Sequence, residues 1–145
     1  MRALVLICIL SAACSGGVTP AVLDTHNDQC GTCRMVVSAH TTASQVVASN
    51  QEPKFFDDLG CLDQFLAVSP LARDARIFVA DHRTGEWVAA ESAVFTRMPA
   101  SAGAMGSLFV AHISTASRDA DRGVTGADVA VGTALPSWSK PGGSR

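Results

Sequence analysis

Three sulfur side chains stand close together in the stretch QCGTCRMVVS, residues 29–38. Cys30 and Cys33 have CxxC spacing, and Met35 follows two residues after Cys33. We expect a strand over residues 34–39, because apolar and β-branched residues follow the cysteines. Residues two apart on a strand share a face, so Cys33 and Met35 would present a thiolate and a thioether side by side. Soft ligands without a set of histidines or carboxylates favour Cu(I) over zinc and the hard cations.

The CxxC spacing has other interpretations, which the residues alone leave open. It is also typical of a thioredoxin-type redox pair, of half a zinc site and of a turn closed by a disulfide. No second pair completes the four ligands of a structural zinc site. A redox motif should open a helix, whereas β-branched residues follow here. Cys30 would then be a further ligand or half of a disulfide. Met35 could also be a core residue, which is the more common place for a methionine.

The N-terminus predicts export. Residues 1–13 combine one basic residue, a short apolar run and small residues, as an export signal does. The run is far shorter than the roughly 20 apolar residues of a membrane-spanning helix. Cys14 follows the small residues as in a bacterial lipoprotein, so we expect a lipid anchor on Cys14 and a tether over residues 14–28. The alternative is an ordinary cut after Ala13 that leaves Cys14 as a free thiol. Either way the expected location is the periplasmic side of the cell envelope, with the outer membrane favoured for an anchored form.

Once Cys8 leaves with the signal and Cys14 is acylated, Cys30, Cys33 and Cys61 remain. Structural cysteines of an exported protein should pair, so an odd number indicates a reactive, intermolecular or metal-binding thiol. Cys61 either faces the copper-binding edge or is an inert buried thiol.

The bulk properties limit the possible functions. Of the 145 residues, 48% are hydrophobic, which suits one core. The net charge of -2 and the absence of a Lys/Arg cluster exclude nucleic acid as a partner. No nucleophile arrangement and no phosphate-binding glycine loop is present, and the adjacent carboxylates Asp57 and Asp58 would point to different faces of a helix. We therefore do not expect an enzyme.

Local patterns predict a mixed fold. We expect a strand at residues 44–48, a helix that begins near residue 51, a hairpin around HRTG with Gly85 in its turn, and a strand at 108–114. A short helix would lie within 116–132, and the Pro/Gly/Ser-rich tail 134–145 would be disordered. Hairpins and single helices without regular βαβ alternation predict an α+β domain built on antiparallel sheet.

Four sequence blocks occur in order between Cys30 and His112: CGTCRM, FFDDLGCLDQFL, VADHRTGEWVAAESAVF, and AMGS before an apolar strand. Together they resemble the accessory lipoproteins of nitrous oxide reductase, the NosL family. The resemblance implies an exported, lipid-anchored copper chaperone that binds Cu(I) and passes it to nitrous oxide reductase during assembly of its copper centres. It also implies a NosL-like copper-binding domain, which we place at 29–133, with two similar ββαβ halves.

The resemblance also implies a ligand set. The copper motif Cys-x-Met of the family falls on Cys33 and Met35, and its downstream methionine falls on Met105, which lies in a loop of small residues. Cys-Met-Met would form a trigonal site suited to Cu(I). Two positions depart from the family pattern: Arg34, where a small or amide residue is usual, and Ala104, where proline is common. Further candidate ligands are Cys30, Cys61 and His112.

Three functions remain open at this point. The first is Cu(I) delivery to an apo copper enzyme. The resemblance implies that this enzyme is nitrous oxide reductase, whereas the chemistry alone would suit any exported copper enzyme. The second is thiol-disulfide exchange through Cys30 and Cys33 on such a partner. The third is an anchored structural module with a Cys30–Cys33 bridge. Three histidines could also bind a second metal: His40, His82 and His112. A structural role is more usual for a histidine in a strand.

Overall fold

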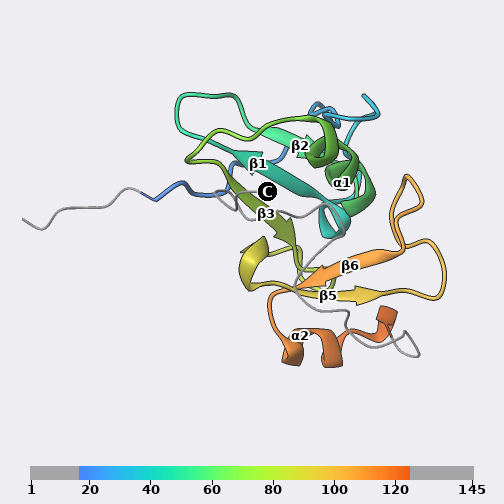
Figure 1. The fold of residues 1–145 in the computed structure, drawn as a ribbon. Coiled ribbons are helices and arrows are strands. Elements are labelled where there is room, and N and C mark those ends of the chain that lie inside the picture. The colour runs from blue at the N-terminus through green and yellow to red at the C-terminus, as the bar shows by residue number, and fades with distance from the viewer. Residues whose placement is uncertain (1–16, 125–145) are drawn as a thin grey trace, which may run out of the picture.

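Two antiparallel sheets and two α-helices make up residues 17–124, the part of the chain that the computed structural model describes (Figure 1). The larger sheet has the order β2-β1-β3-β4, formed by β1 (Ser44–Val47), β2 (Lys54–Phe56), β3 (Arg76–Ala80) and β4 (Trp87–Ala89). The smaller sheet pairs β5 (Val94–Arg97) with β6 (Phe109–His112). Helices α1 (Leu59–Val68) and α2 (Thr115–Ala120) each follow a hairpin. This architecture confirms the predicted α+β class with antiparallel sheet.

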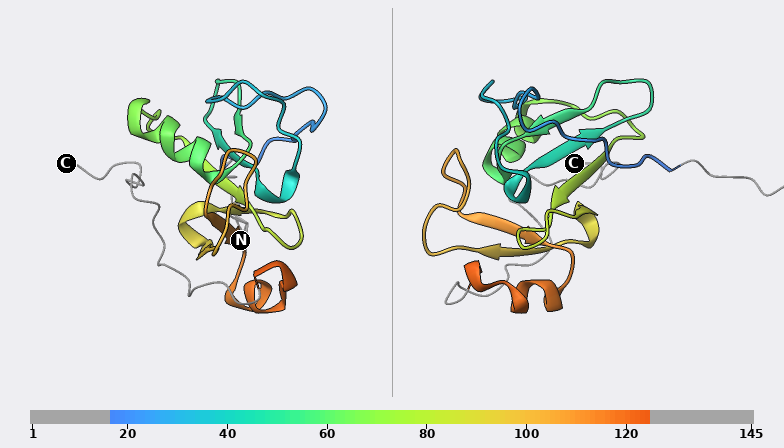
Figure 2. Two further views of the ribbon diagram at one scale, coloured as in Figure 1. Left: turned by 90° about the vertical axis from the view of Figure 1, so that its right-hand side faces the viewer. Right: turned by 180° about the vertical axis from the view of Figure 1, so that it is seen from behind.

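The described residues show the first three elements of the implied ββαβ order in both halves and the fourth in the first half alone. The first half runs β1-β2-α1-β3, and the second runs β5-β6-α2 before the described residues end. Both helices begin in the same way: Asp58 accepts a hydrogen bond from the Cys61 amide at 2.8 Å, and Ser114 accepts one from the Ser117 amide at 3.1 Å. In all views α2 lies beneath the β5-β6 sheet, on the side away from α1 (Figure 2). Each half is therefore a hairpin with a capped helix against it.

The core lies between the larger sheet and α1. The central strand β3 buries four of its five residues, and α1 contributes Leu59 and Leu62 to the same cluster. Gln45 is fully buried in β1, and its amide satisfies both backbone groups of Ala21, at 2.8 and 3.2 Å. A buried polar side chain thus fixes the incoming N-terminal segment. Within the described part of the chain, no helix is long and apolar enough to cross a membrane.

The predicted strand over residues 34–39 is wrong. Residues 31–33 form a turn that folds the chain back, so that Cys30 donates its amide to the Met35 carbonyl at 2.8 Å and Val37 donates to Asp28 at 2.9 Å. Arg34 has a φ of 67°, which interrupts any extended run. The apolar residues after the cysteines therefore pair with the segment just before them rather than with the sheet. As a result, Cys33 and Met35 are not neighbours on a strand face.

The start of the first helix also differs from the prediction. Residues 54–56 form β2, in which Phe55 pairs with Gln45 of β1, and the helix begins only after Asp58. Phe55 and Phe56 are both buried, so pairing in the sheet wins over the helical spacing that Phe55 shares with the leucines. Asp57 and Asp58 precede the helix and do not lie on its faces.

Other expectations agree with the structure. The strand at 44–48, the strand at 108–114 and the short helix within 116–132 correspond to β1, β6 and α2, and residues 125–132 of that last range lie outside the described chain. Gly85 has a φ of 75° in the turn between β3 and β4, where a glycine is favoured. The export signal, Cys14 and the tail 134–145 lie outside the described residues.

Candidate metal centre

The three cysteines of the described chain form one cluster. The sulfur atoms of Cys30, Cys33 and Cys61 all lie within 4.8 Å of one another, and all three are free thiols. Cys30 and Cys61 are buried, whereas Cys33 is half-buried. The sequence allowed Cys61 to be either a ligand or an inert core thiol. In the structure it is both buried and part of the cluster. The cluster has an inner side of two enclosed thiols and an outer side at Cys33.

Backbone contacts bring the CxxC turn onto the first turn of α1. The Gly31 amide donates to the Phe55 carbonyl at 2.8 Å, and the Thr32 hydroxyl donates to the Cys61 carbonyl at 2.8 Å. A Cβ at Gly31 would lie 3.0 Å from the buried Phe56 ring, so this close approach favours glycine. Residues 30–33 are therefore attached to both β2 and α1, which fixes the distance between the CxxC sulfurs and Cys61.

The environments of Cys30 and Cys61 shift their pKa values in opposite directions. Burial by itself would raise the pKa of Cys30, but the backbone amides of Cys33, Asp57 and Thr32 hydrogen-bond to its sulfur and lower the pKa below its usual value. Burial, the hydrogen bond to Cys30 and neighbouring negative charge raise the pKa of Cys61 well above its usual value. Cys30 is therefore the more easily ionised thiol of the pair, and Cys61 is the one that releases its proton less readily.

A buried carboxylate lies next to Cys30. Asp57 is 1% exposed, and neither of its carboxylate oxygens has a well-formed hydrogen bond among the described residues. Burial raises its pKa against the opposing effect of the Ser38 amide, and the nearby charge of Asp58 adds to the rise. The amide of the same residue donates to the Cys30 sulfur. A cation bound at the thiols would offset the cost of this concentrated negative charge, so the donor set and its surroundings fit a soft metal ion.

Asp58 connects the Met105 loop to the helix that carries Cys61. One carboxylate oxygen accepts the Cys61 amide, and the other accepts the amides of Met105 at 2.9 Å and Ser107 at 3.2 Å. The loop closes around this side chain so tightly that a Cβ at Gly103 would lie 2.4 Å from Asp58 atoms. This role of Asp58 was not predicted from the sequence. The N-cap signal of an aspartate before a helix could have revealed it, had the helix start not been placed near residue 51.

The other predicted ligands lie at different places. Met35 is 52% exposed and Met105 is 47% exposed, so both thioethers are accessible from solvent rather than packed in the core. His112 does not join the cysteines; its imidazole lies in a separate group with His82 and Asp121. The ring of His40 packs against that of Trp87, with 4.9 Å between the ring centroids.

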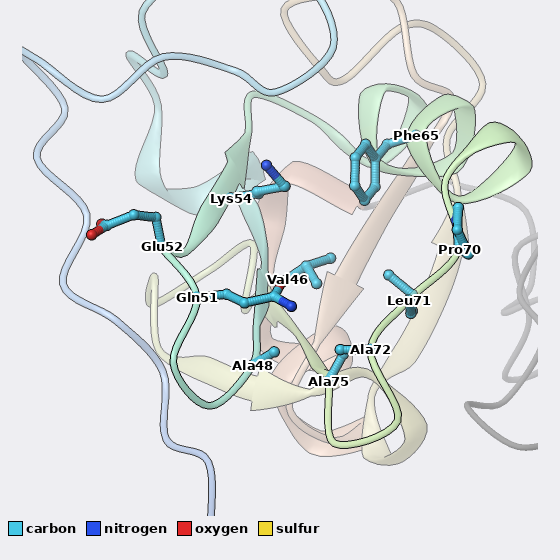
Figure 3. Close-up of a pocket in the computed structure, with 10 residues that line it drawn as sticks. All are labelled: Val46, Ala48, Gln51, Glu52, Lys54, Phe65, Pro70, Leu71, Ala72 and Ala75. Carbon is cyan, nitrogen blue, oxygen red and sulfur yellow. The ribbon is translucent and has the colours of Figure 1, made fainter.

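A pocket elsewhere on the larger sheet offers no sulfur or imidazole ligand. It opens between the β1-β2 connection, α1 and the loop before β3, with Val46, Phe65 and Leu71 among its walls (Figure 3). Its lining contains no cysteine, methionine or histidine. The thiol cluster therefore remains the candidate site.

Fold and site define a class: a small antiparallel α+β domain whose grouped thiols suit a soft metal ion. The sequence matches the NosL family over residues 21–123, and the chain belongs to this family. The fold resembles the crystal structure of the copper chaperone NosL from Shewanella denitrificans, with a TM-score of 0.56 and 16% sequence identity, over 75% of this chain and 87% of that chain. No curated protein matches the sequence.

Proposed function

We propose that this protein is a copper chaperone that carries Cu(I) as its cargo at the thiol cluster and gives it to an apo copper enzyme. The observation that carries the proposal is the group of three sulfur atoms within 4.8 Å of one another, with one thiol accessible. Membership of the NosL family and the fold shared with a copper chaperone support it. Thiolates and thioethers hold Cu(I) well and Cu(II) poorly.

Cys33 is the central ligand in this proposal. It belongs both to the thiol cluster and to the Cys-x-Met motif, so it connects the buried thiol of Cys30 with the exposed thioether of Met35. Met105 would complete the outer side from its loop. Ligands on the outer side can be exchanged one at a time with those of a partner, whereas a fully enclosed site would retain the ion. Delivery then needs only ligand exchange, and no catalytic residue.

The finer assignment follows the family. We propose nitrous oxide reductase as the acceptor, with assembly of its copper centres as the biological role. An anchored location on the periplasmic side of the envelope, through acylated Cys14, would keep the chaperone where such enzymes mature. Intact mass spectrometry of the detergent-extracted protein tests the anchor, because acylation adds the mass of a lipid that Cys14→Ser abolishes. An unlipidated, soluble wild-type protein would contradict it.

The test of copper binding is an anaerobic Cu(I) titration against a chromophoric chelator, on reduced protein without its signal and with Cys14 replaced. We expect one tight equivalent, weakened at least tenfold by Met35→Ala or Met105→Ala because each removes a soft ligand. Met98→Ala is the matched control, since Met98 is a half-buried methionine at the start of the same loop. Absence of tight binding would refute the chaperone proposal.

The same variants separate delivery from thiol-disulfide exchange. Exchange requires Cys30 with Cys33 and ignores the methionines, whereas delivery requires Cys33 and the methionines. Mixing Cu(I)-loaded protein with apo nitrous oxide reductase should restore the copper spectrum of the enzyme. Restoration by a Cys33→Ser variant would contradict the proposed route.

A further inference from the structure

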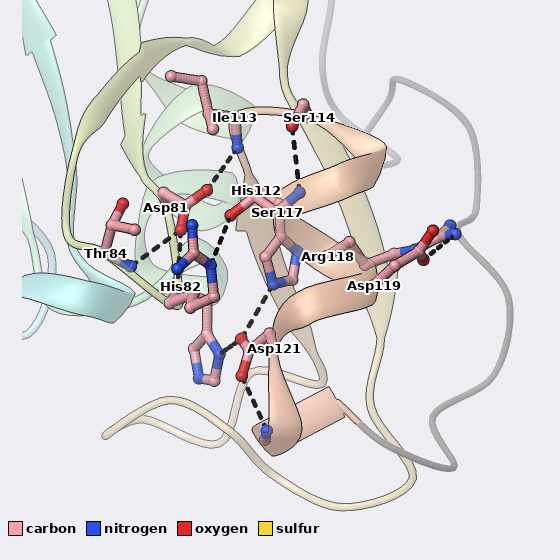
Figure 4. Close-up of polar contacts among 12 residues, drawn as sticks. Asp81, His82, Thr84, His112, Ile113, Ser114, Ser117, Arg118, Asp119 and Asp121 are labelled. Atoms are coloured by element: carbon pink, nitrogen blue, oxygen red, sulfur yellow. Dashed lines mark hydrogen bonds and ion pairs between the residues drawn. The ribbon is translucent and has the colours of Figure 1, made fainter.

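Two imidazoles converge on one carboxylate in the second half of the chain (Figure 4). His82 Nδ1 lies 2.7 Å from Asp121 Oδ2, and His112 Nε2 lies 3.1 Å from the same oxygen. The three ligand atoms lie within 4.8 Å of one another. These residues come from three elements: the β3-β4 turn, the end of β6 and the residue that ends α2. None of the three belongs to the thiol cluster.

The backbone holds both histidines in place. Asp81, directly before His82, accepts the amides of Arg83 and Thr84 on one oxygen and the Ile113 amide on the other, at 2.8 to 3.0 Å. The His82 amide donates to the Ala111 carbonyl at 2.8 Å. The segments that carry His82 and His112 are thus joined to each other on both sides. Such preorganisation lowers the conformational cost of gathering ligands.

The third ligand is fixed just as firmly. The second oxygen of Asp121 accepts the Gly123 amide at 2.8 Å, which leaves Oδ2 directed at the two rings. His112 is fully buried, and Asp121 Oδ2 is the partner of its Nε2. Its other ring nitrogen has no hydrogen bond among the described residues and is free to carry the proton. The side chain of His82 is 20% exposed, which gives an ion a way in.

We propose that His82, His112 and Asp121 form a second metal site, which takes a divalent transition-metal cation such as Zn(II) and leaves a fourth position for water. Neighbouring ligand atoms of a tetrahedral zinc site are slightly farther apart than hydrogen-bonded atoms. The observed distances of 2.7 and 3.1 Å therefore need only a small outward movement to admit the ion. Each imidazole then binds through the nitrogen that now faces Asp121 and carries its proton on the other.

The ligand types separate this site from the cysteines. Two imidazoles and a carboxylate suit borderline divalent ions such as Zn(II) and Cu(II), whereas Cu(I) prefers sulfur. A bound ion would join α2, which has only six residues, to β6 and to the β3-β4 turn. The proposal does not depend on copper delivery, because no thiol takes part.

Zinc is the probe for the test, because Cu(II) would oxidise the thiols. Full-length reduced protein labelled with 15N at histidine is titrated with Zn(II), and the ring nitrogens are followed by NMR. We expect the resonances of His82 Nδ1 and His112 Nε2 to move to metal-bound values, while those of the exposed His26 and His40 do not. Unchanged His82 and His112 rings at excess Zn(II) would overturn the proposal, whatever the thiols bind.

Variants test the third ligand. Asp121→Asn should weaken zinc binding at the histidines at least tenfold, whereas Asp119→Asn, on an exposed carboxylate two residues earlier, should not change it. His82→Gln is the milder second variant: it retains a hydrogen-bond donor near Asp121 but should lose the zinc-dependent increase in melting temperature. Equal zinc affinity at the histidines in the Asp121 and Asp119 variants would contradict the assignment, as would His112 Nε2 still moving to its metal-bound value with unchanged affinity in His82→Gln.

Discussion

Three cysteines that look alike in the sequence differ in chemistry because of their backbone surroundings. Cys30 receives amide hydrogen bonds that lower the pKa of its thiol, while burial and neighbouring negative charge raise the pKa of Cys61. Cys33 is half-buried and lies on the side from which a partner can approach. Only Cys33 combines contact with the cluster and access from outside.

Cys33 and Cys61 should therefore differ in their effect on Cu(I) affinity. We expect Cys33→Ala to weaken Cu(I) binding at least 100-fold, because it removes the ligand shared by the cluster and the Cys-x-Met motif. Cys61→Ala should weaken it less than tenfold, because the sulfur atoms of Cys30 and Cys33 and the exposed methionines remain to hold the ion. Anaerobic competition with a Cu(I) chelator measures both, and an equal loss would show that Cys61 is a ligand as well.

At the level of elements, the start of α1 organises the site. The sequence could predict that a CxxC turn, a methionine loop and a helix with Cys61 exist, because each has a local pattern. It could not predict that one carboxylate joins them. Asp58 contacts residues 47 and 49 positions later in the chain, and no periodicity in the sequence reports such a contact. The error at residues 34–39 has a different, local origin: the left-handed backbone of Arg34 interrupts the extended run, and the segment pairs with the short stretch just before the turn.

Asp58→Ala should accordingly affect two elements together. The loss of the N-cap and of two amide hydrogen bonds to a buried carboxylate should lower the free energy of unfolding by roughly 2 to 4 kcal/mol. It should also release the Met105 loop and lower Cu(I) affinity by about the same factor as Met105→Ala. Urea unfolding and chelator competition measure the two effects. The control is Gln64→Ala at an exposed position of α1. This change should alter stability by less than about 0.5 kcal/mol.

At the scale of the whole molecule, the halves meet at Asp81. This residue follows β3 of the larger sheet, and its carboxylate accepts the amide of Ile113, which follows β6 of the smaller one. The sequence predicted the turn in which Asp81 lies, because HRTG with Gly85 has a local hairpin signal. The link between the sheets depends on a parallel bridge between Asp81 and Ala111, which only the folded chain brings together. Local patterns thus predicted the individual strands, turns and helices, and the resemblance to a family predicted their arrangement in two similar halves.

This link should make the stability of the protein depend on pH in acid. Burial alone would raise the pKa of Asp81, but the amides of Ile113, Thr84 and Arg83 and the Ser117 hydroxyl bind the carboxylate and lower its pKa to about 2. An aspartate that is more acidic when folded stabilises the protein at pH values above its unfolded pKa of 3.8, and this contribution disappears as the pH falls toward 2. The difference corresponds to about 2 kcal/mol at neutral pH.

We therefore expect urea unfolding to give Asp81→Asn a free energy of unfolding about 2 kcal/mol below that of the wild type at pH 7. This difference in free energy should shrink steadily between pH 4 and pH 2. Chelator is kept in every sample so that no metal at the neighbouring histidines contributes. Glu91→Gln, an exposed carboxylate in the 3-10 turn η2 (Ala90–Ser92), should follow the wild type throughout. The free energies of unfolding of Asp81→Asn and the wild type could instead differ by the same amount down to pH 2. This result would mean that the side chain acts through its shape alone. The charge of Asp81 would then not be what holds the two sheets together.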